Sequence, residues 1–428
     1  MSVIGIVKSV EECIITVSTV QTVVDYNLTK GQIISNCVPF ASWRFTSSST
    51  VEPHYFLFDV EMVSGPKVRV QRGSASGEFY VIVYVVEFEP SKVKVQQGIW
   101  SIGSAAASDT VSLSQSVTKN NAAIQFYYEY DNATLNSRAF LVGGYIKTGG
   151  SDIEFERWQT ETTTCSGHYY VFEALGGEFS VGHYDTGDVT AQFVEVTVPA
   201  VTLSRTFLLT SYQTDYNSTD IERSTFYARM KDTVTVRVDR NQNSLDNSRH
   251  WIQVIESPDD TFFVQHRYAY RDASTANDVW TLPQAVDPDR AISQVPTVFP
   301  GARTDGSLWY HGVYRTYLSD AGTKYNMERY LPSPPDNSAY TVGQIIEFTG
   351  TEYFCEGVVT VESTAVSGTA VQLFNRNTTE LVGDTLTTGS GTFAIPTRFH
   401  EDLHYLVVLS PVSGTNSAVL DWLDPQVP

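Results

Sequence analysis

The sequence predicts an all-β protein: tandem antiparallel β-sandwich or barrel-like modules, followed by one further small β-sandwich. Three observations lead to this fold class. Residues that suit a pleated, half-buried surface are abundant, with 24 Tyr and 22 Phe against four Met in 428 residues. Apolar and polar residues alternate at 67–71, 92–96 and 233–238, which indicates antiparallel sheets with one buried face. One pattern of strands then recurs along most of the chain.

The recurring pattern is an alternating strand that ends in Arg, a polar loop, and a second strand that ends in Glu. The copies cover residues 67–88, 153–175, 234–257 and 325–348. The arginines, spaced by 85, 83 and 89 residues, are Arg72, Arg157, Arg240 and Arg329. The glutamates, spaced by 86, 83 and 91 residues, are Glu87, Glu173, Glu256 and Glu347. Because two separate landmarks keep nearly the same period, we infer four degenerate repeats of roughly 85 residues.

The repeated Arg and Glu admit three roles. They lie on consecutive strands, so a cross-strand ion pair that sets the register is one hypothesis. Two unrelated charges in contact with solvent are the simpler alternative, and the favoured one. A repeated active site is disfavoured because no His, Ser or second carboxylate repeats with them.

The repeat period divides the chain into segments. We predict an N-terminal arm or strand at 1–24, β-modules at 25–103, 104–188, 189–272 and 273–350, and a C-terminal β-sandwich at 351–428. The fourth module is divergent. Its entry at 279–302 holds four prolines, which predicts a stiff extended connection. The run PSPP at 332–335 replaces the Ser/Gly-rich loop of the earlier copies.

The chain carries 48 acidic and 28 basic residues, a formal charge of −20. Binding to nucleic acid depends on Lys and Arg displacing counterions, and no basic run is present, so direct contact with DNA or RNA is not expected. Lys8, Glu11 and Glu12 interrupt the apolar N-terminal stretch, so we predict no signal peptide. No apolar run reaches the length of about 18 residues that a membrane span needs. We therefore expect synthesis in a host cytoplasm and no membrane contact.

Residues with catalytic or metal-binding chemistry are scattered. His400 and His404 stand four residues apart, but a turn is predicted there and no third zinc ligand is evident. Acidic pairs such as Asp259-Asp260 lack the pattern of a calcium loop. Ser390 lies in a predicted β-turn without the strand-to-helix setting of a nucleophile. We predict no catalytic, cofactor or metal site, and an enzyme is the least favoured function.

Cysteine and aromatic residues complete the candidates. The wide spacing of the cysteines predicts buried, reduced thiols, and they are Cys13, Cys37, Cys165 and Cys355. Core packing accounts for most of the aromatic clusters, including those at 126–130 and 168–170. Exposed Tyr and Trp suit a protein interface or a sugar platform. On that basis we predict interface residues at Trp309, Tyr310 and Trp422.

The C-terminal segment has its own pattern. It contains Gly357-x-Val359, Gly368 before AVQLF, the turn and strand TGSGTFAIP, and a last strand at 405–409. These residues resemble the carboxypeptidase regulatory-like domain. The resemblance covers residues 351–428, and it implies a transthyretin-like β-sandwich that serves as an accessory module without catalytic residues.

The first repeat also resembles a known family. The segment VYVVEFEPSKVKVQQG at 83–98 is similar to a β-repeat of tailed-phage structural proteins, in which a VVEF strand precedes a VQxG strand. The later copies depart from it at 172–174, 254–256 and 346–348. The resemblance implies a non-catalytic virion protein that decorates or stabilises capsid or tail, with other virion proteins as partners and a homo-oligomeric state. The alternative is a carbohydrate- or receptor-binding fibre or adhesin array that contacts a host surface glycan.

Overall fold

The computed structural model divides the chain into two compact units. One comprises Ile6–Thr349, and the other comprises Gly350–Pro428 with Met1–Gly5. The residues that the structure describes are 5–46, 57–73, 77–130, 141–160, 162–216, 226–240, 246–258, 261–271, 276–295, 302–303, 314–329, 339–348, 353–361, 364–375, 381–397, 404–409 and 418–423. Within them, no helix has the length and apolar character needed to cross a membrane.

The predicted fold class is confirmed, because the chain is all-β and built from antiparallel sheets. The larger unit holds four modules. Each has a long sheet and a short sheet, both of three strands, and the fourth module adds the short strand β22 (Ala302–Arg303) to its long sheet.

The long sheets are made of the first, third and sixth strands of each module or their equivalents. They are β1 (Val7–Val17), β3 (Cys37–Phe45) and β6 (Phe79–Phe88) in module 1; β7 (Val93–Ile102), β9 (Ala122–Tyr130) and β12 (Cys165–Ala174) in module 2; β13 (Ser180–Asp185), β15 (Thr206–Thr214) and β18 (Ser248–Glu256) in module 3; and β19 (Phe262–Arg271), β21 (Ala291–Gln294) and β25 (Ala339–Phe348) in module 4. The last strand of each module is central, so Val86 of β6 pairs with Val10 of β1 and Val38 of β3.

The short sheets repeat the same order. They are β2 (Val23–Asn27), β4 (Phe58–Val63) and β5 (Lys67–Arg72); β8 (Ser108–Ser112), β10 (Val142–Ile146) and β11 (Asp152–Arg157); β14 (Phe193–Thr197), β16 (Phe226–Asp232) and β17 (Thr235–Arg240); and β20 (Asn277–Thr281), β23 (Arg315–Ser319) and β24 (Lys324–Glu328). One 3-10 turn precedes the second long strand in each of the first three modules: η1 (Ile34–Asn36), η3 (Lys119–Asn121) and η4 (Leu203–Arg205).

The strand pairing places the start of each repeat earlier than the predicted limits. The segment predicted as an N-terminal arm contains β1, which pairs along β6 as an edge strand of module 1. The predicted limits at 25, 104, 189 and 273 each fall after the first long strand of a module. The Arg and Glu landmarks set the period but lie in the second half of each module, so they could not mark where it begins.

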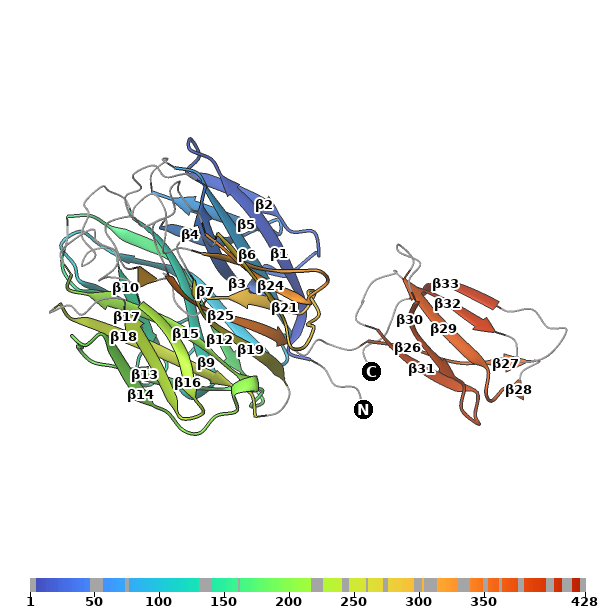
Figure 1. Cartoon of the computed structure of the whole chain (residues 1–428). Coiled ribbons are helices and arrows are strands. Elements are labelled where there is room, and N and C mark those ends of the chain that lie inside the picture. The colour runs from blue at the N-terminus through green and yellow to red at the C-terminus, as the bar shows by residue number, and fades with distance from the viewer. Residues whose placement is uncertain are drawn as a thin grey trace. The chain divides into compact units, whose positions relative to one another are not determined.

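The four modules form a closed ring. The short sheet of each module packs on the long sheet of the next: β4 against β9, β10 against β15, and β16 against β25. The same contact returns from module 4 to module 1, where β23 packs against β3 and β6. Figure 1 accordingly shows the blue strands of module 1 beside the orange strands of module 4. We call the four contacts seams 1–2, 2–3, 3–4 and 4–1.

Aromatic side chains from all four modules meet in one core. Phe88 of module 1 lies 5.6 Å from Phe172 of module 2 and 6.0 Å from Phe348 of module 4, measured between ring centroids. Phe262 of module 4 in turn lies 5.2 Å from Phe207 of module 3. None of these rings is more than 3% exposed. Burying one such side chain contributes about 1.5–3 kcal/mol, so the shared core stabilises the ring as one body.

The smaller unit has its own sheets and core. Its strands are β26 (Tyr353–Val358) paired with β31 (Thr392–Thr397), β27 (Thr360–Val361) paired with β28 (Thr364–Ala365), and a four-stranded sheet in the order β30 (Leu381–Leu386), β29 (Ala370–Asn375), β32 (His404–Leu409) and β33 (Ala418–Leu423). The predicted strands at 370–374, 392–395 and 405–409 are present. The core side chains are Cys355, Val371, Leu373, Ile395 and Leu406.

Candidate functional site

The four repeated arginines are buried, and none is more than 2% exposed. Arg72, at the end of β5, donates to the carbonyl oxygens of Ser18 (2.7 Å), Gln21 (2.9 Å) and Gly77 (2.9 Å). Ser18 and Gln21 belong to the loop between β1 and β2, and Gly77 precedes β6. Burial lowers the pKa of Arg72 to about 10. The guanidinium therefore ties two loops to the end of a strand through its fork of N–H groups.

The next two arginines repeat this arrangement. Arg157 donates to the carbonyl oxygens of Gly103 (3.1 Å), Ala106 (2.8 Å) and Thr163 (3.0 Å). Arg240 donates to the carbonyl oxygens of Thr190 and Asp246. Burial lowers the pKa of Arg240 as well. A buried cation is costly unless it is fully hydrogen-bonded, so carbonyl groups at these corners hold each arginine in place.

The repeated glutamates hold a different part of each module. Each accepts a hydrogen bond from the backbone N–H just before the second long strand: Ile33 to Glu87 (3.2 Å), Thr118 to Glu173 (2.6 Å), Thr202 to Glu256 (2.7 Å) and Asp287 to Glu347 (2.8 Å). In the first three modules this N–H belongs to the residue that caps the 3-10 turn. Burial raises the pKa of Glu87 and Glu347.

In module 1 neither the cross-strand ion pair nor the favoured alternative of two solvent-exposed charges is found. Arg72 contacts Gly77 just before β6 begins, whereas Glu87 is the residue before the last one of that strand. The two charges thus lie at opposite ends of the central strand and form no cross-strand pair. Neither faces solvent, because Arg72 is 1% and Glu87 is 6% exposed. Each instead satisfies backbone groups that no strand pairs.

Residues at a third repeated position form hydrogen bonds across the seams. This position lies three residues before each glutamate. It is occupied by Tyr84, Tyr170, Gln253 and Gln344. The Gln253 amide accepts from the N–H of Ile124 (2.7 Å) and donates to its carbonyl oxygen (2.8 Å) across seam 2–3. Gln344 treats Leu208 in the same way across seam 3–4, at 2.8 and 3.0 Å. Sequence reasoning missed this position, although a polar residue in an otherwise apolar strand was its signal.

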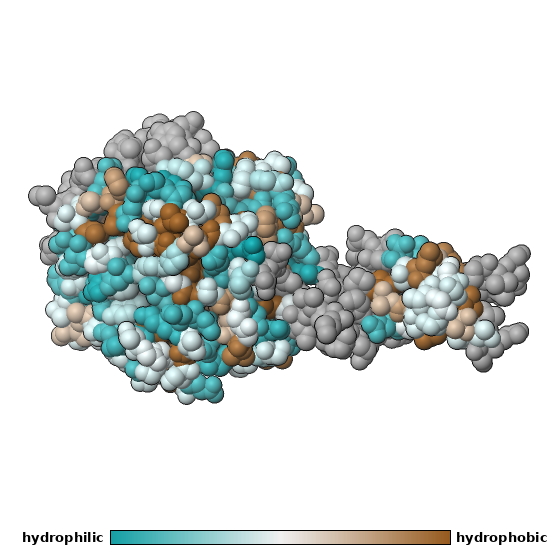
Figure 2. All heavy atoms as spheres, turned by 90° about the horizontal axis from the view of Figure 1, so that it is seen from below, coloured by the Kyte–Doolittle hydropathy of each residue, from teal (hydrophilic) through white to brown (hydrophobic). Residues whose placement is uncertain are grey.

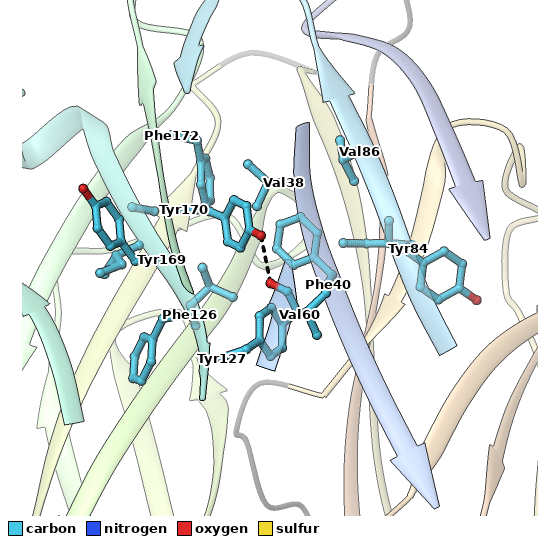
Figure 3. Packing of buried hydrophobic residues seen from close by; sticks show 14 of the residues in the cluster. Val38, Phe40, Val60, Tyr84, Val86, Phe126, Tyr127, Tyr169, Tyr170 and Phe172 are labelled. Atoms are coloured by element: carbon cyan, nitrogen blue, oxygen red, sulfur yellow. Dashed lines mark hydrogen bonds between the residues drawn. The ribbon is translucent and has the colours of Figure 1, made fainter. Parts of the chain in front are cut away.

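Seam 1–2 uses tyrosine for a physical reason. The residue of module 1 equivalent to Ile124 is Pro39, which has no N–H to give to a glutamine. Tyr170 instead donates to the carbonyl oxygen of Val60 (2.8 Å, dashed in Figure 3) and accepts from the N–H of Met62 (3.1 Å). Tyr127, labelled beside it, donates to the Pro39 carbonyl oxygen at 3.2 Å. The hydroxyl groups thus replace the amide pairing.

Seam 4–1 closes the ring through hydroxyl groups. Tyr84 accepts from the Ser293 hydroxyl (3.1 Å) and from the N–H of Leu318 (3.3 Å). The N–H of Thr316 donates to the Ser42 hydroxyl at 3.0 Å. These residues are 200 or more positions apart along the chain, so the contacts join its first module to its fourth.

Three histidines lie in the seams. In seam 1–2, Nδ1 of His168 is 2.5 Å from a carboxylate oxygen of Asp59. Burial lowers the pKa of His168, but the hydrogen bond and charge of Asp59 outweigh burial and keep the pKa above its usual value. His183 and His266 instead meet carbonyl oxygens of Lys119 (2.9 Å) and Leu203 (3.1 Å) across seams 2–3 and 3–4. Burial lowers the pKa of both.

The structure describes little of the predicted interface residues. Trp309 and Tyr310 lie outside the described residues, as does His400. Trp422 belongs to β33, and only its backbone is described. Among the described residues, no group of three or more His, Cys, Asp or Glu could hold a metal ion. All four cysteines are buried free thiols.

Exposed apolar side chains recur on the first long strand of the modules. Ile14, Ile99 and Tyr268 are 57%, 67% and 43% exposed, and each pairs with the residue five positions before the repeated glutamate. Asp185 takes this place in module 3. In the view of Figure 2, apolar residues form patches among hydrophilic ones on the larger unit.

Comparison with known proteins adds little to this description. No family model and no curated protein matches the chain. Among solved structures, the Bacillus anthracis TIE protein is similar at 9% sequence identity with a TM-score of 0.15. The alignment covers 77% of this chain and 56% of that one, so the chain spans about half the length of the solved protein. A likeness at this TM-score carries no argument about fold or function.

Proposed function

We propose that this chain is a non-catalytic structural component of a tailed-phage particle, which decorates or stabilises the capsid or tail. The proposal is supported by the work that the repeated residues do. Arg72, Arg157 and Arg240 bind loop carbonyl groups, and the four glutamates bind the backbone before the second long strand. The residues that the copies share therefore stabilise the fold of each module.

The closed ring favours decoration over extension. Each module uses its short sheet to cover the long sheet of the next, and β23 covers β3 and β6 in the same way. A head-to-tail contact that closes on itself leaves no free copy of the same surface for further stacking. Decoration by one rigid body therefore accounts for the arrangement better than a fibre that grows by adding modules.

Co-sedimentation tests the proposal. The purified full chain would be mixed with phage particles that lack it and centrifuged through a sucrose cushion. We expect saturable co-sedimentation with capsids or tails. A chain that remains in the supernatant and does not self-assemble contradicts the proposal. If it instead binds glycans or host cells, the receptor-binding alternative replaces it.

A further inference from the structure

Seam 4–1 carries two arginines on one aromatic ring. Arg44 lies on β3 of module 1 and Arg315 on β23 of module 4. Their guanidinium carbons are 4.9 and 5.2 Å from the ring centroid of Tyr80. Their side chains are 21% and 16% exposed, so both keep access to solvent.

The two guanidinium groups share a single carboxylate. Glu328 accepts from Nε of Arg315 at 2.7 Å and lies 3.2 Å from Nε of Arg44. Its other oxygen accepts from the Tyr317 hydroxyl at 2.7 Å. Arg44 also donates to the carbonyl oxygen of Phe45 at 3.3 Å. Two guanidinium groups offer ten N–H donors, far more than these acceptors take up.

Seam 2–3 surrounds the equivalent glutamate with a different set of charges, because its arginine lies on β18 at the position that Tyr80 holds on β6. Arg249 lies over Trp251 at 5.0 Å and has two carboxylates, Asp185 at 2.9 Å and Glu156 at 3.7 Å. Tyr145 donates to Glu156 at 2.7 Å, as Tyr317 does to Glu328. Glu156 and Glu328 are therefore the same position in two modules. One arginine meets two carboxylates here, whereas two arginines share Glu328 in seam 4–1.

Module 1 has no acid at the position that corresponds to Asp185 of module 3. Asp185 pairs with Trp251, five residues before Glu256. The same place in module 1 is held by Ile14, which pairs with Ile82 and is 57% exposed. An apolar, solvent-exposed side chain thus replaces the second acid of seam 2–3.

One other carboxyl group faces this region from β1. Glu12 shares a hydrogen bond with the Tyr84 hydroxyl. Burial raises its pKa, so it is a weaker counter-charge than an exposed acid. Burial, and after it the charge of Arg315, lowers the pKa of Arg44, as expected for a cation short of acceptors.

We propose that seam 4–1 binds an external oxyanion, a carboxylate or phosphate group, between Arg44 and Arg315. In seam 2–3 the comparable acid is supplied by the chain itself, since Asp185 accepts from Arg249 at 2.9 Å. Planar guanidinium groups match both kinds of oxyanion in bidentate geometry. Two guanidinium groups on one aromatic ring attract an anion locally, although the chain as a whole has a net charge of −20. The inference does not depend on the proposed function.

Anion titration of the full chain tests the site. Phosphate, sulfate and glucuronate would be titrated at constant ionic strength, with NaCl as the balance, while thermal unfolding and calorimetric heat are followed. We expect saturable binding that raises the melting temperature, and Arg44→Gln weakens it by about tenfold or more. A stronger response to phosphate than to glucuronate assigns a phosphate ligand, and the reverse order assigns a carboxylate.

A second variant keeps the test decisive if Arg44→Gln fails to fold. Ile14→Asp rebuilds the acid of seam 2–3, so it should abolish anion binding and raise stability in the absence of anion. Ile99→Asp, at the equivalent exposed position of module 2, adds the same charge and should leave binding unchanged. Anion binding that is absent in the wild type, or equal in the wild type and Ile14→Asp, overturns the proposal.

Discussion

Gln344 of module 4 accepts from the backbone N–H of Leu208 of module 3 at 2.8 Å and donates to the carbonyl oxygen of the same residue at 3.0 Å. All four groups are buried. This contact brings together strands more than 130 residues apart, and Gln253 repeats it with Ile124 one seam earlier. The seams of the ring are therefore specified by polar groups as well as by apolar packing.

Removing this amide should destabilise the ring. Gln344→Leu leaves the N–H and carbonyl of Leu208 buried without partners, at a cost of about 1–3 kcal/mol for each unsatisfied group. Urea unfolding followed by tryptophan fluorescence measures the loss. Gln97→Leu, at an exposed site on β7, is the control and should change stability by less than about 0.5 kcal/mol. Equal effects of the two variants would contradict the role of Gln344.

Pro39 has no backbone N–H, whereas the equivalent Ile124 has one. This difference predicts that substitutions of Pro39 and Tyr170 have non-additive effects on the free energy of unfolding. Tyr170→Gln alone places an amide opposite Pro39, which cannot donate to it. In a Pro39→Ala background the N–H is restored, so the same change should cost less. A double-mutant cycle measures the difference, and we expect a coupling of about 1 kcal/mol. Additive effects would show that the Pro39 backbone does not select the tyrosine.

The repeated buried arginines should not be replaceable by lysine. Arg157→Lys keeps the charge but has fewer donors in a different geometry, so it cannot reach Gly103, Ala106 and Thr163 together. We expect a loss of about 3 kcal/mol or more in the free energy of unfolding, because a buried charge loses partners. Arg69→Lys, in the part-exposed pair with Asp25, should cost less than about 1 kcal/mol. Thermal and urea unfolding of both variants give the comparison.

Acid should weaken seams 2–3 and 3–4. The folded-state pKa of His183 and of His266 is lowered by burial, so the unfolded chain, with a pKa near about 6.5, binds more protons. Their contribution to stability is therefore complete above about pH 6.5 and is lost as the pH falls. His250, whose pKa burial lowers to about 3, acts in the same direction.

His168 acts in the opposite direction. Its raised pKa gives stability that is complete below about pH 6.5 and is lost as the pH rises through the folded-state value. The raised pKa of Glu12, Glu87 and Glu347 acts in the same direction as that of His168. The contribution of the seam histidines is therefore measured as a fall in melting temperature between pH 7 and 5 relative to a variant that lacks them. In the double variant with His183→Gln and His266→Gln the fall should be smaller. An unchanged pH profile would exclude these two histidines as the cause.

The sequence alone determined the secondary structure, the number of repeats and their period. Alternation of apolar and polar residues is a local signal, so strands such as those at 67–72 and 235–240 could be predicted from it. The period rested on Arg72, Glu87 and their copies. The buried thiols of the cysteines also followed from spacing and composition.

Only the tertiary structure decided what the repeated residues do and how the modules meet. The acceptors of Arg72 include a carbonyl group more than 50 residues away, and Tyr84 meets Ser293 more than 200 residues along the chain. No pattern in a short window encodes such partners, because they depend on which backbone groups the sheets leave unpaired. Closure of the ring is likewise a property of four seams acting together. For that reason a series of β-modules in the sequence became a closed ring in the structure, with two arginines left facing one carboxylate where it closes.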